Sequence, residues 1–268
     1  MLNLFRSTSE KNSQISPPKV YLGSFNINGS QLDKRTAQIW LKEASSCDII
    51  LLGFQEFPTA SIPSSNVRNI SDENSQEIKT FLRPNKTFNS SQENQFLSIL
   101  QEVLGEEFEL SGDVSMGENP TYGKVPIGGE KTVEWWGFIR LMCFSRIGLI
   151  RPEEMEMFVC PTGIKKSCYG SPSTTKGGDD MGGEAMKGYN EGCSPDKGLV
   201  VLYVSKWSLL VINGHLAATN LHNVPEIEFN KKRVEELSRL YKGLWSLVPD
   251  LCDAHTILIG DLNFRFSF

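Results

Sequence analysis

Four apolar segments of this sequence each end in a short polar cluster. The clusters lie at Asn26, at Gln55-Glu56, at His215 and at Asp261/Asn263. Short apolar segments bounded by polar residues are typical of β-strands. If the four strand ends gather along one edge of stacked sheets, carboxylates, amides and an imidazole would share one cleft. Periodicity predicts the strand ends but does not show that they converge.

Further strands and a few helices are expected between these ends. Residues 47–54 form an almost continuous apolar run, which is typical of a strand buried on both faces. Residues 198–204 and 208–214 flank a tight turn near Lys206-Trp207, which predicts a hairpin. The other expected strands cover residues 20–26, 108–114, 137–145, 155–160 and 256–260. Helical spacing predicts helices over residues 33–45, 92–104 and 225–247, the last with Ile227, Val234, Leu237 and Leu240 on its apolar side.

The composition predicts one globular domain with a polar tail and two loose insertions. Hydrophobic residues make up 39% and charged residues 22% of the 268 residues, which is ordinary for a domain that buries a core. Residues 1–18 are rich in Ser and Asn and are expected to form a flexible tail before a domain over residues 19–268. Residues 58–90 and 163–195 are crowded with small and polar residues, so both are predicted to be surface insertions.

Charge and cysteine usage argue against several protein classes. The net charge of −5 argues against a protein that coats nucleic acid by charge alone, although a metal ion or a few focused basic residues can still bind phosphate. The six cysteines include no Cys-x-x-Cys pair and only three histidines accompany them, so a structural zinc site is not expected. Without a signal-peptide pattern, reduced thiols in a cytoplasmic protein are expected.

The polar residues at the strand ends have the chemistry needed for metal-assisted hydrolysis of a phosphate ester. Glu56 and Asn26 offer a carboxylate and an amide oxygen, the ligands that Mg²⁺ prefers. Asp261 with Asn263 could orient and deprotonate a water molecule, while His215 could stabilise phosphoryl oxygens. Taken singly, each residue more often has a structural role. Gly-Asp-x-Asn, for example, is a common turn because Asp and Asn bond to their own backbone.

In the same order, these residues resemble the inositol polyphosphate 5-phosphatases of the endonuclease/exonuclease/phosphatase superfamily. Residues 25–29, Phe-Asn-Ile-Asn-Gly, resemble the family's opening Trp-Asn-x-x-Gly motif. Residues 49–57 and 136–144 are similar to its second motif and to a core strand. Residues 213–218, Asn-Gly-His-Leu-Ala-Ala, and residues 260–265, Gly-Asp-Leu-Asn-Phe-Arg, are similar to Asn-Ser-His-Leu-Ala-Ala and Gly-Asp-Leu-Asn-Tyr-Arg. These last two motifs are the specific ones, and the resemblance extends over residues 20 to 268.

The resemblance implies a fold and a set of site residues. The implied fold is an α/β sandwich in which two mixed β-sheets pack face to face and are flanked by helices. Asp196-Lys197-Gly198 resembles the family's Asn-Lys-Gly-Gly, with Asp for Asn and Leu199 for the second Gly. The implied roles are metal binding by Asn26 and Glu56, catalysis by His215, Asp261 and Asn263, and substrate binding by Lys197, Asn230 and Arg265.

The resemblance also implies an activity. A protein of this family would use Mg²⁺ to remove the 5-phosphate from phosphoinositides or soluble inositol polyphosphates. The expected partners are therefore the phosphorylated inositol substrate and, transiently, a membrane surface, while no nucleic acid is expected.

The sequence departs from the family pattern at its C-terminal end. The family continues with a Trp-Cys-Asp-Arg motif and a Ser-Asp-His motif, and neither occurs before Phe268. On this basis the domain is expected to be incomplete, with an uncovered sheet edge and poor stability. Two alternatives to 5-phosphatase activity stay open: a phosphoinositide or protein binder without turnover, and a related phosphodiesterase such as a nuclease, which would call for a basic stripe.

Overall fold

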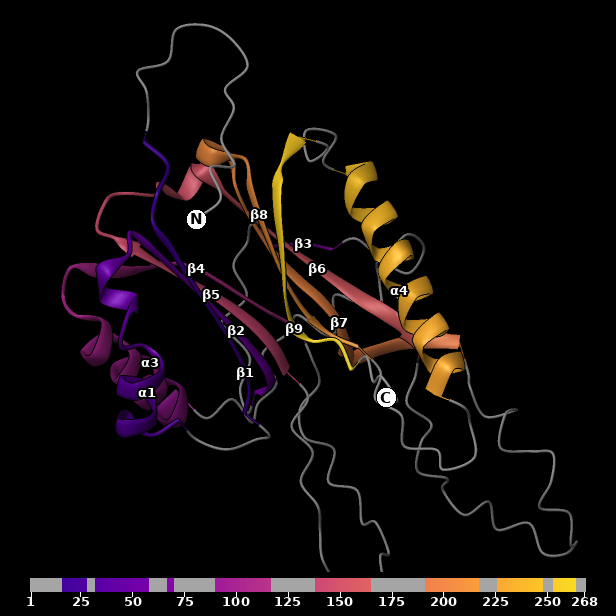
Figure 1. Ribbon diagram of the computed structural model, residues 1–268, viewed down its shortest axis with the longest axis horizontal. Helices are drawn as coiled ribbons and strands as arrows, with labels where there is room; N and C mark the ends of the chain where they lie inside the picture. Colours follow the sequence, from indigo (N-terminus) through magenta and orange to yellow (C-terminus); the bar gives the residue numbers. More distant parts are fainter. Residues whose placement is uncertain are drawn as a thin grey trace, which may run out of the picture.

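The described part of the chain forms two mixed β-sheets that pack face to face, with helices on both outer faces (Figure 1). This is the fold class expected from the sequence. The computed structural model describes residues 16–27, 32–57, 67–69, 90–116, 138–164, 191–216, 226–247 and 253–263. The expected tail up to residue 15 and most of the two expected insertions, residues 58–66, 70–89 and 165–190, lie outside the described residues.

The first sheet has the strand order β1-β2-β5-β4. β1 (Val20–Asn26) runs parallel to β2 (Ile49–Phe57), while β5 (Phe138–Arg146) lies antiparallel to β2 and to β4 (Phe108–Met116). Nearly every residue of β2 and β5 is buried, as the continuous apolar runs in the sequence predict. The parallel pair β1 and β2 forms one side of this sheet.

The second sheet has the strand order β3-β6-β7-β8-β9. Short β3 (Val67–Asn69) runs parallel to β6 (Met155–Ile164), and β6, β7 (Glu191–Val204) and β8 (Leu209–His215) are antiparallel neighbours. β9 (His255–Asp261) closes this side of the sheet parallel to β8. The first sheet therefore has a parallel pair of strands at one edge, and the second sheet has one at each edge.

The expected hairpin between β7 and β8 is confirmed. One turn of 3-10 helix, Ser205–Trp207, joins the two strands. At the other end of the hairpin, β6 and β7 extend into the stretch predicted to be a loose insertion, because Thr162 pairs with Ser194 and Ile164 pairs with Glu191. The ends of that stretch thus belong to the sheet.

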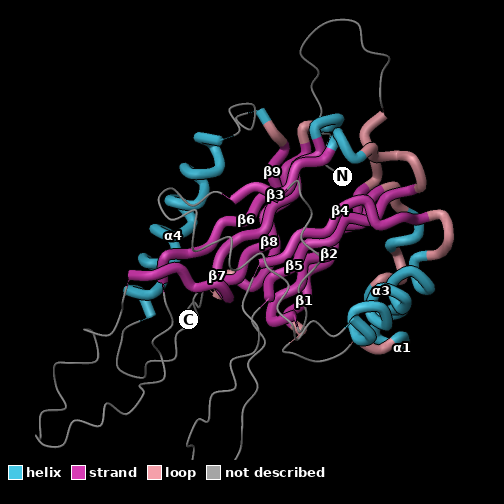
Figure 2. Tube along the Cα trace, turned by 180° about the vertical axis from the view of Figure 1, so that it is seen from behind, coloured by secondary structure: helices cyan, strands magenta, loops and turns pink. Residues whose placement is uncertain are grey.

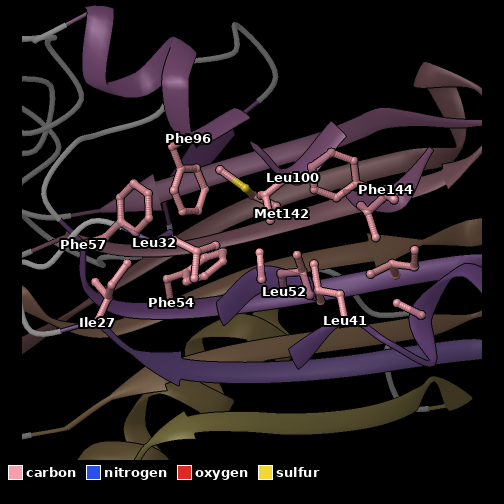
Figure 3. Packing of buried hydrophobic residues seen from close by; sticks show 14 of the residues in the cluster. Ile27, Leu32, Leu41, Leu52, Phe54, Phe57, Phe96, Leu100, Met142 and Phe144 are labelled. Carbon is pink, nitrogen blue, oxygen red and sulfur yellow. The ribbon is translucent and has the colours of Figure 1, made fainter. Parts of the chain in front are cut away.

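Two helices cover the outer face of the first sheet (Figure 2). α1 (Lys34–Trp40) begins at Asp33, whose Oδ1 accepts a hydrogen bond of 2.9 Å from the Thr36 amide, and the bonds from Thr36 lower the pKa of the Asp33 carboxyl. α3 (Ser90–Leu104) places Phe96 over the sheet (Figure 3). The Phe96 ring meets those of Phe54 and Phe57 edge to face, with centroids 5.3 and 4.7 Å away.

α4 (Glu226–Leu247) covers the outer face of the second sheet. Its inner side agrees with the prediction at Leu237, which packs against the core, but Ile227 and Val234, also expected there, are 65% and 57% exposed. The side chain of Leu240, the fourth expected residue, lies outside the described part of the structure. The residues that turn inward are Arg233, Leu237, Tyr241 and Leu244. Both sets have helical spacing, so periodicity alone could not choose between them. None of the described helices is long and apolar enough to span a membrane.

The space between the sheets is filled by the alternate side chains of six strands. These inward-facing residues include Ile49 and Leu51 of β2, Val114 of β4, Leu141 and Cys143 of β5, Val159 of β6, Val200 and Leu202 of β7, and Val211 of β8. Burial raises the pKa of the Cys143 thiol to about 12, so this thiol stays protonated at neutral pH. Cys47, Cys143 and Cys160 are free and buried.

Glycines let the two sheets come close together at one end of this layer. A Cβ on Gly53 of β2 would lie 2.7 Å from Asn213 Cγ and 2.8 Å from Ile259 Cδ1, both in the opposite sheet. A Cβ on Gly260, whose φ is 121°, would lie 2.1 Å from the carbonyl oxygen of Gly214 on the neighbouring strand. The backbone at this end is therefore packed too tightly for side chains at these positions.

Gly53→Ala is expected to lower the free energy of unfolding by about 1–3 kcal/mol, because overpacking a dense interior forces neighbouring side chains and backbone to move. Denaturant unfolding measures this loss. Gly112→Ala is the matched control, since a Cβ there would mainly meet the flexible thioether of Met155, and its loss should be smaller. Equal losses at the two positions would contradict the close approach at Gly53.

Candidate functional site

The C-terminal ends of two parallel strand pairs, one from each sheet, meet at one end of the sandwich. Asn26 of β1 pairs with Gln55 of β2, and His215 of β8 pairs with Asp261 of β9. Across the sheets, Asn26 Nδ2 donates a hydrogen bond of 3.1 Å to Asp261 Oδ2. His215 Nε2 lies 3.8 Å from Glu56 Oε1, also across the sheets. The structure thus brings together the four polar strand ends that periodicity left unplaced.

Glu56 lies within β2 in a β-bulge, not beyond the strand as the sequence pattern indicated. Gln55 and Glu56 together stand opposite the single residue Ile139 of β5. Glu56 has φ of 53°, the left-handed region that costs an L-residue about 1–2 kcal/mol. A bulge of this kind turns a side chain away from the regular alternation of the strand. Gln55 is consequently buried, while the Glu56 carboxylate is partly exposed beside His215.

Asp261 has both a local and a cross-sheet contact. Its Oδ1 accepts a hydrogen bond of 3.1 Å from the backbone N–H of Asn263, which forms the turn that Gly-Asp-x-Asn commonly adopts. Asn263, with φ of 55°, donates from Nδ2 to the carbonyl oxygen of Leu216 at 2.8 Å. The Leu216 amide in turn donates to the Asp261 carbonyl oxygen at 3.1 Å. The turn holds the Asp261 backbone, and Oδ2 remains directed at Asn26.

Lys197 and His215 form a buried polar pair beside Glu56. Lys197 is 6% exposed and His215 is 2% exposed. Lys197 Nζ lies 2.7 Å from His215 Nε2 and 3.1 Å from Nδ1. An ammonium group can only donate hydrogen bonds, so this contact requires a ring nitrogen that accepts, and thus an imidazole that is neutral. Burying a cation is costly unless it is compensated, and Glu56 supplies a carboxylate 3.8 Å from the same ring nitrogen, Nε2.

Two of the predicted substrate-binding residues are not placed in this group. Asn230 lies on α4, where its Oδ1 accepts a hydrogen bond of 2.6 Å from Nη1 of Arg233 on the same helix. Arg265 lies outside the described residues. The structure gathers the other predicted site residues: Asn26, Glu56, Lys197, His215, Asp261 and Asn263.

The oxygen atoms gathered here suit a hard divalent cation. Among the residues that the structure describes, no three His, Cys, Asp or Glu side chains form a metal-binding group. Mg²⁺ is commonly held by one or two carboxylates while it keeps several waters. Glu56 and Asp261 offer carboxylates and Asn26 an amide oxygen, so the donor chemistry fits Mg²⁺ better than a zinc site built of thiolates.

A buried amide pair behind the site had no role assigned from the sequence. Asn213 Oδ1 accepts a hydrogen bond of 2.7 Å from Gln55 Nε2, and its Nδ2 donates to the carbonyl oxygens of Phe54 and Arg140 at 3.0 and 2.9 Å. The signal was present in the sequence. Side chains alternate along a strand, so Asn213 must face the same buried layer as Val211. A polar side chain at such a position must find partners in the core.

Glu56→Gly is expected to be more stable than Glu56→Ala by about 1 kcal/mol, because glycine adopts positive φ without steric cost. Both variants lack the carboxylate, so their difference in denaturant unfolding isolates the backbone. At Glu109 of β4, which pairs with Ser145 and has no positive φ, the same pair of substitutions should give the opposite order. An alanine variant at position 56 as stable as the glycine variant would show that Glu56 carries no left-handed strain.

Comparison with known proteins gives a distant structural resemblance. No protein-family model matches the chain, and no curated protein sequence matches it. Among solved structures, the chain is similar to the inositol polyphosphate 5-phosphatase domain of SPsynaptojanin in complex with inositol (1,4)-bisphosphate and calcium ion, with a TM-score of 0.42 and 14% sequence identity. The match covers 94% of this chain and 54% of that chain, so the chain spans about half the length of its structural neighbour.

Proposed function

We propose that this chain carries part of the active site of a Mg²⁺-dependent phosphatase that removes the 5-phosphate of phosphoinositides or soluble inositol polyphosphates. The observation that carries the proposal is the meeting of Asn26 with Asp261 and of Glu56 with His215 across the two sheets, beside the buried Lys197. Carboxylates, an amide, an imidazole and an ammonium group are the types that phosphate-ester hydrolysis uses.

The proposed roles are those implied by the sequence resemblance, and the position of each side chain supports them. Glu56 and Asn26 would hold Mg²⁺, which supplies charge neutralisation at the phosphate oxygens when it is bound. Asp261, held in place by the Asn263 amide, would orient a water molecule and accept its proton at a carboxylate oxygen. His215, neutral in its contact with Lys197, would donate a hydrogen bond to a phosphoryl oxygen.

Substrate binding would depend on basic and amide side chains. Lys197 is a cation held next to the catalytic imidazole, so it would attract a phosphate group to this end of the sandwich. Asn230 of α4 and Arg265 are the further substrate contacts that we propose from the sequence resemblance. The substrate class would take the protein transiently to the cytoplasmic surface of a membrane. The net charge of −5 supports an inositol phosphate over a nucleic acid as the ligand.

A second candidate function is phosphoinositide binding without turnover. The observation in its favour is the position of Lys197, whose Nζ lies 2.7 Å from His215 Nε2 at the same end of the sandwich, where its charge could attract a phosphate group. Lys197 could then hold a phosphate without hydrolysis. Retention of the chain on vesicles that contain phosphatidylinositol 4,5-bisphosphate, with no phosphate release in Mg²⁺, would support this candidate and contradict the phosphatase.

Asp261→Ala is expected to reduce phosphate release from phosphatidylinositol 4,5-bisphosphate vesicles by about 100-fold or more, because it removes the proposed general base. Chelation of Mg²⁺ should abolish release by the unsubstituted chain. Asp253→Ala removes an exposed carboxylate just before the same strand and should leave the rate unchanged. Release by the Asp261→Ala variant at the rate of the unsubstituted chain would rule out the assigned role.

Lys197→Met is expected to raise KM for the phosphorylated substrate by about 10-fold or more, because the isosteric side chain lacks the charge that attracts phosphate. Lys206→Met is the control, since Lys206 lies in the turn between β7 and β8 and donates to the Leu149 carbonyl oxygen. Initial rates over a range of substrate concentrations separate KM from kcat. An unchanged KM in a folded Lys197→Met variant would remove Lys197 from substrate binding.

A further inference from the structure

Asn213 uses its whole side-chain amide to join the two sheets just behind the candidate site. Its oxygen accepts from Gln55, and its two amide hydrogens reach the carbonyl oxygens of Phe54 and Arg140. Phe54 and Arg140 are the paired residues of β2 and β5 immediately before the bulge at Glu56. One side chain of the second sheet therefore binds both strands of the first sheet at the point where the regular pairing stops.

The position of Asn213 links it to the acidic and imidazole groups of the site. Along β8, Asn213 lies two residues before His215 and on the same side of the strand. Across the sheet it pairs with Ile259, which lies two residues before Asp261. On the first sheet its partner Gln55 directly precedes Glu56. The Asn213 amide therefore lies in the layer of side chains directly behind Glu56, His215 and Asp261.

The surrounding packing leaves little room for another arrangement. A Cβ on Gly53 would lie 2.7 Å from Asn213 Oδ1, and a Cβ on Gly260 would lie 2.9 Å from the same atom. Asn213 and Gln55 are both buried, so water cannot easily replace a lost hydrogen bond. Glu56, by contrast, is held in a backbone conformation that an L-residue disfavours. A conformation of this kind persists only where its surroundings enforce it.

We propose that Asn213, through Gln55 and the Phe54 carbonyl, is the positioning residue that keeps Glu56 in its bulged conformation facing His215. Asn213 has no place among the groups that would touch substrate or metal, and it acts on them through the backbone of β2. The functional part of this inference rests on the phosphatase proposed above. The structural part, the link between Asn213 and the bulge, stands without it.

Hydrogen exchange tests the structural part independently of any activity. The Ile27 amide donates to the Gln55 carbonyl oxygen, and the Leu216 amide donates to the Asp261 carbonyl oxygen, so these amides report on both sides of the site. In Gln55→Met, which removes the contact to Asn213 but keeps the side-chain volume, we expect exchange at Ile27 to quicken by about 10-fold or more. In Asn213→Leu we expect both amides to exchange faster.

Val211→Ala is the matched control for loss of stability. Val211 is buried on the same strand and the same side as Asn213 but two residues further from the site. The control should quicken exchange evenly across both sheets, because it weakens packing without releasing the bulge. The proposal is overturned if Gln55→Met leaves exchange at Ile27 unchanged, or if its pattern of exchange equals that of Val211→Ala.

Kinetics then test the functional part. With Gln55→Met, kcat for phosphate release from phosphatidylinositol 4,5-bisphosphate should fall by about 10- to 100-fold, since small displacements of catalytic groups have effects of this size. KM should change much less, because Lys197 is untouched. Val211→Ala at a temperature well below its Tm should keep its kcat. If kcat and KM fall together, and by the same factor in Gln55→Met and Val211→Ala, Asn213 has only a structural role.

The two experiments fail in different ways. If the unsubstituted chain releases no phosphate, phosphatase activity of this chain by itself is contradicted, while local exchange at Ile27 in Gln55→Met still supports the link between Asn213 and the bulge. If phosphate is released but Gln55→Met keeps full kcat, the phosphatase stands and the positioning role is overturned.

Discussion

The separation of the two sheets at the ends of β1, β2, β8 and β9 is the constraint on which the candidate site depends. Asn26 reaches Asp261, and Glu56 lies beside His215, because these ends face one another across the sandwich. Larger side chains between the sheets would hold the polar groups apart. Gly53 removes that obstacle, and the amide of Asn213 fills the space with hydrogen bonds to the opposite strands. The packing of the sheets and the geometry of the site are therefore one structural feature.

Backbone strain is concentrated at the same end of the molecule. Glu56 and Asn263 are two of the three described non-glycine residues at positive φ, the third being Ser208 in the turn before β8. Gly198, which pairs with His215, and Gly260 of β9 also have positive φ beside the site. Such conformations are sparsely populated in unfolded chains, so the folded core must compensate for them. The apolar layer between the sheets supplies this stability. Strain of this kind is typical of sites where side chains must be held in place for binding or chemistry.

Local charge at the site differs from the charge of the whole chain. The chain is acidic overall, yet Lys197 is buried against His215, and the Glu56 carboxylate lies 3.8 Å from the same ring nitrogen. The charge of the ammonium group and that of the nearby carboxylate offset each other, which lowers the free-energy cost of burying Lys197. A phosphate or a divalent cation that entered this end would meet one charge of each sign close by. The short-range arrangement, and not the net charge, supports the proposed anionic ligand and metal ion.

Apolar runs and alternation in the sequence by themselves predicted the main strands and the hairpin, because each depends on residues close together in the chain. The sandwich class was expected only from the resemblance of the motifs to a known family. The apolar runs placed Asn26, His215 and Asp261 correctly at strand ends. They could not choose the buried side of α4, where Ile227 and Val234 proved exposed, since two sets of residues had helical spacing. Only the tertiary structure decided three features of the site. These are the bulge at Glu56, the amide link at Asn213, and the contact between Asn26 and Asp261, which are 235 residues apart. Each of these depends on how one sheet lies against the other, which no local periodicity encodes.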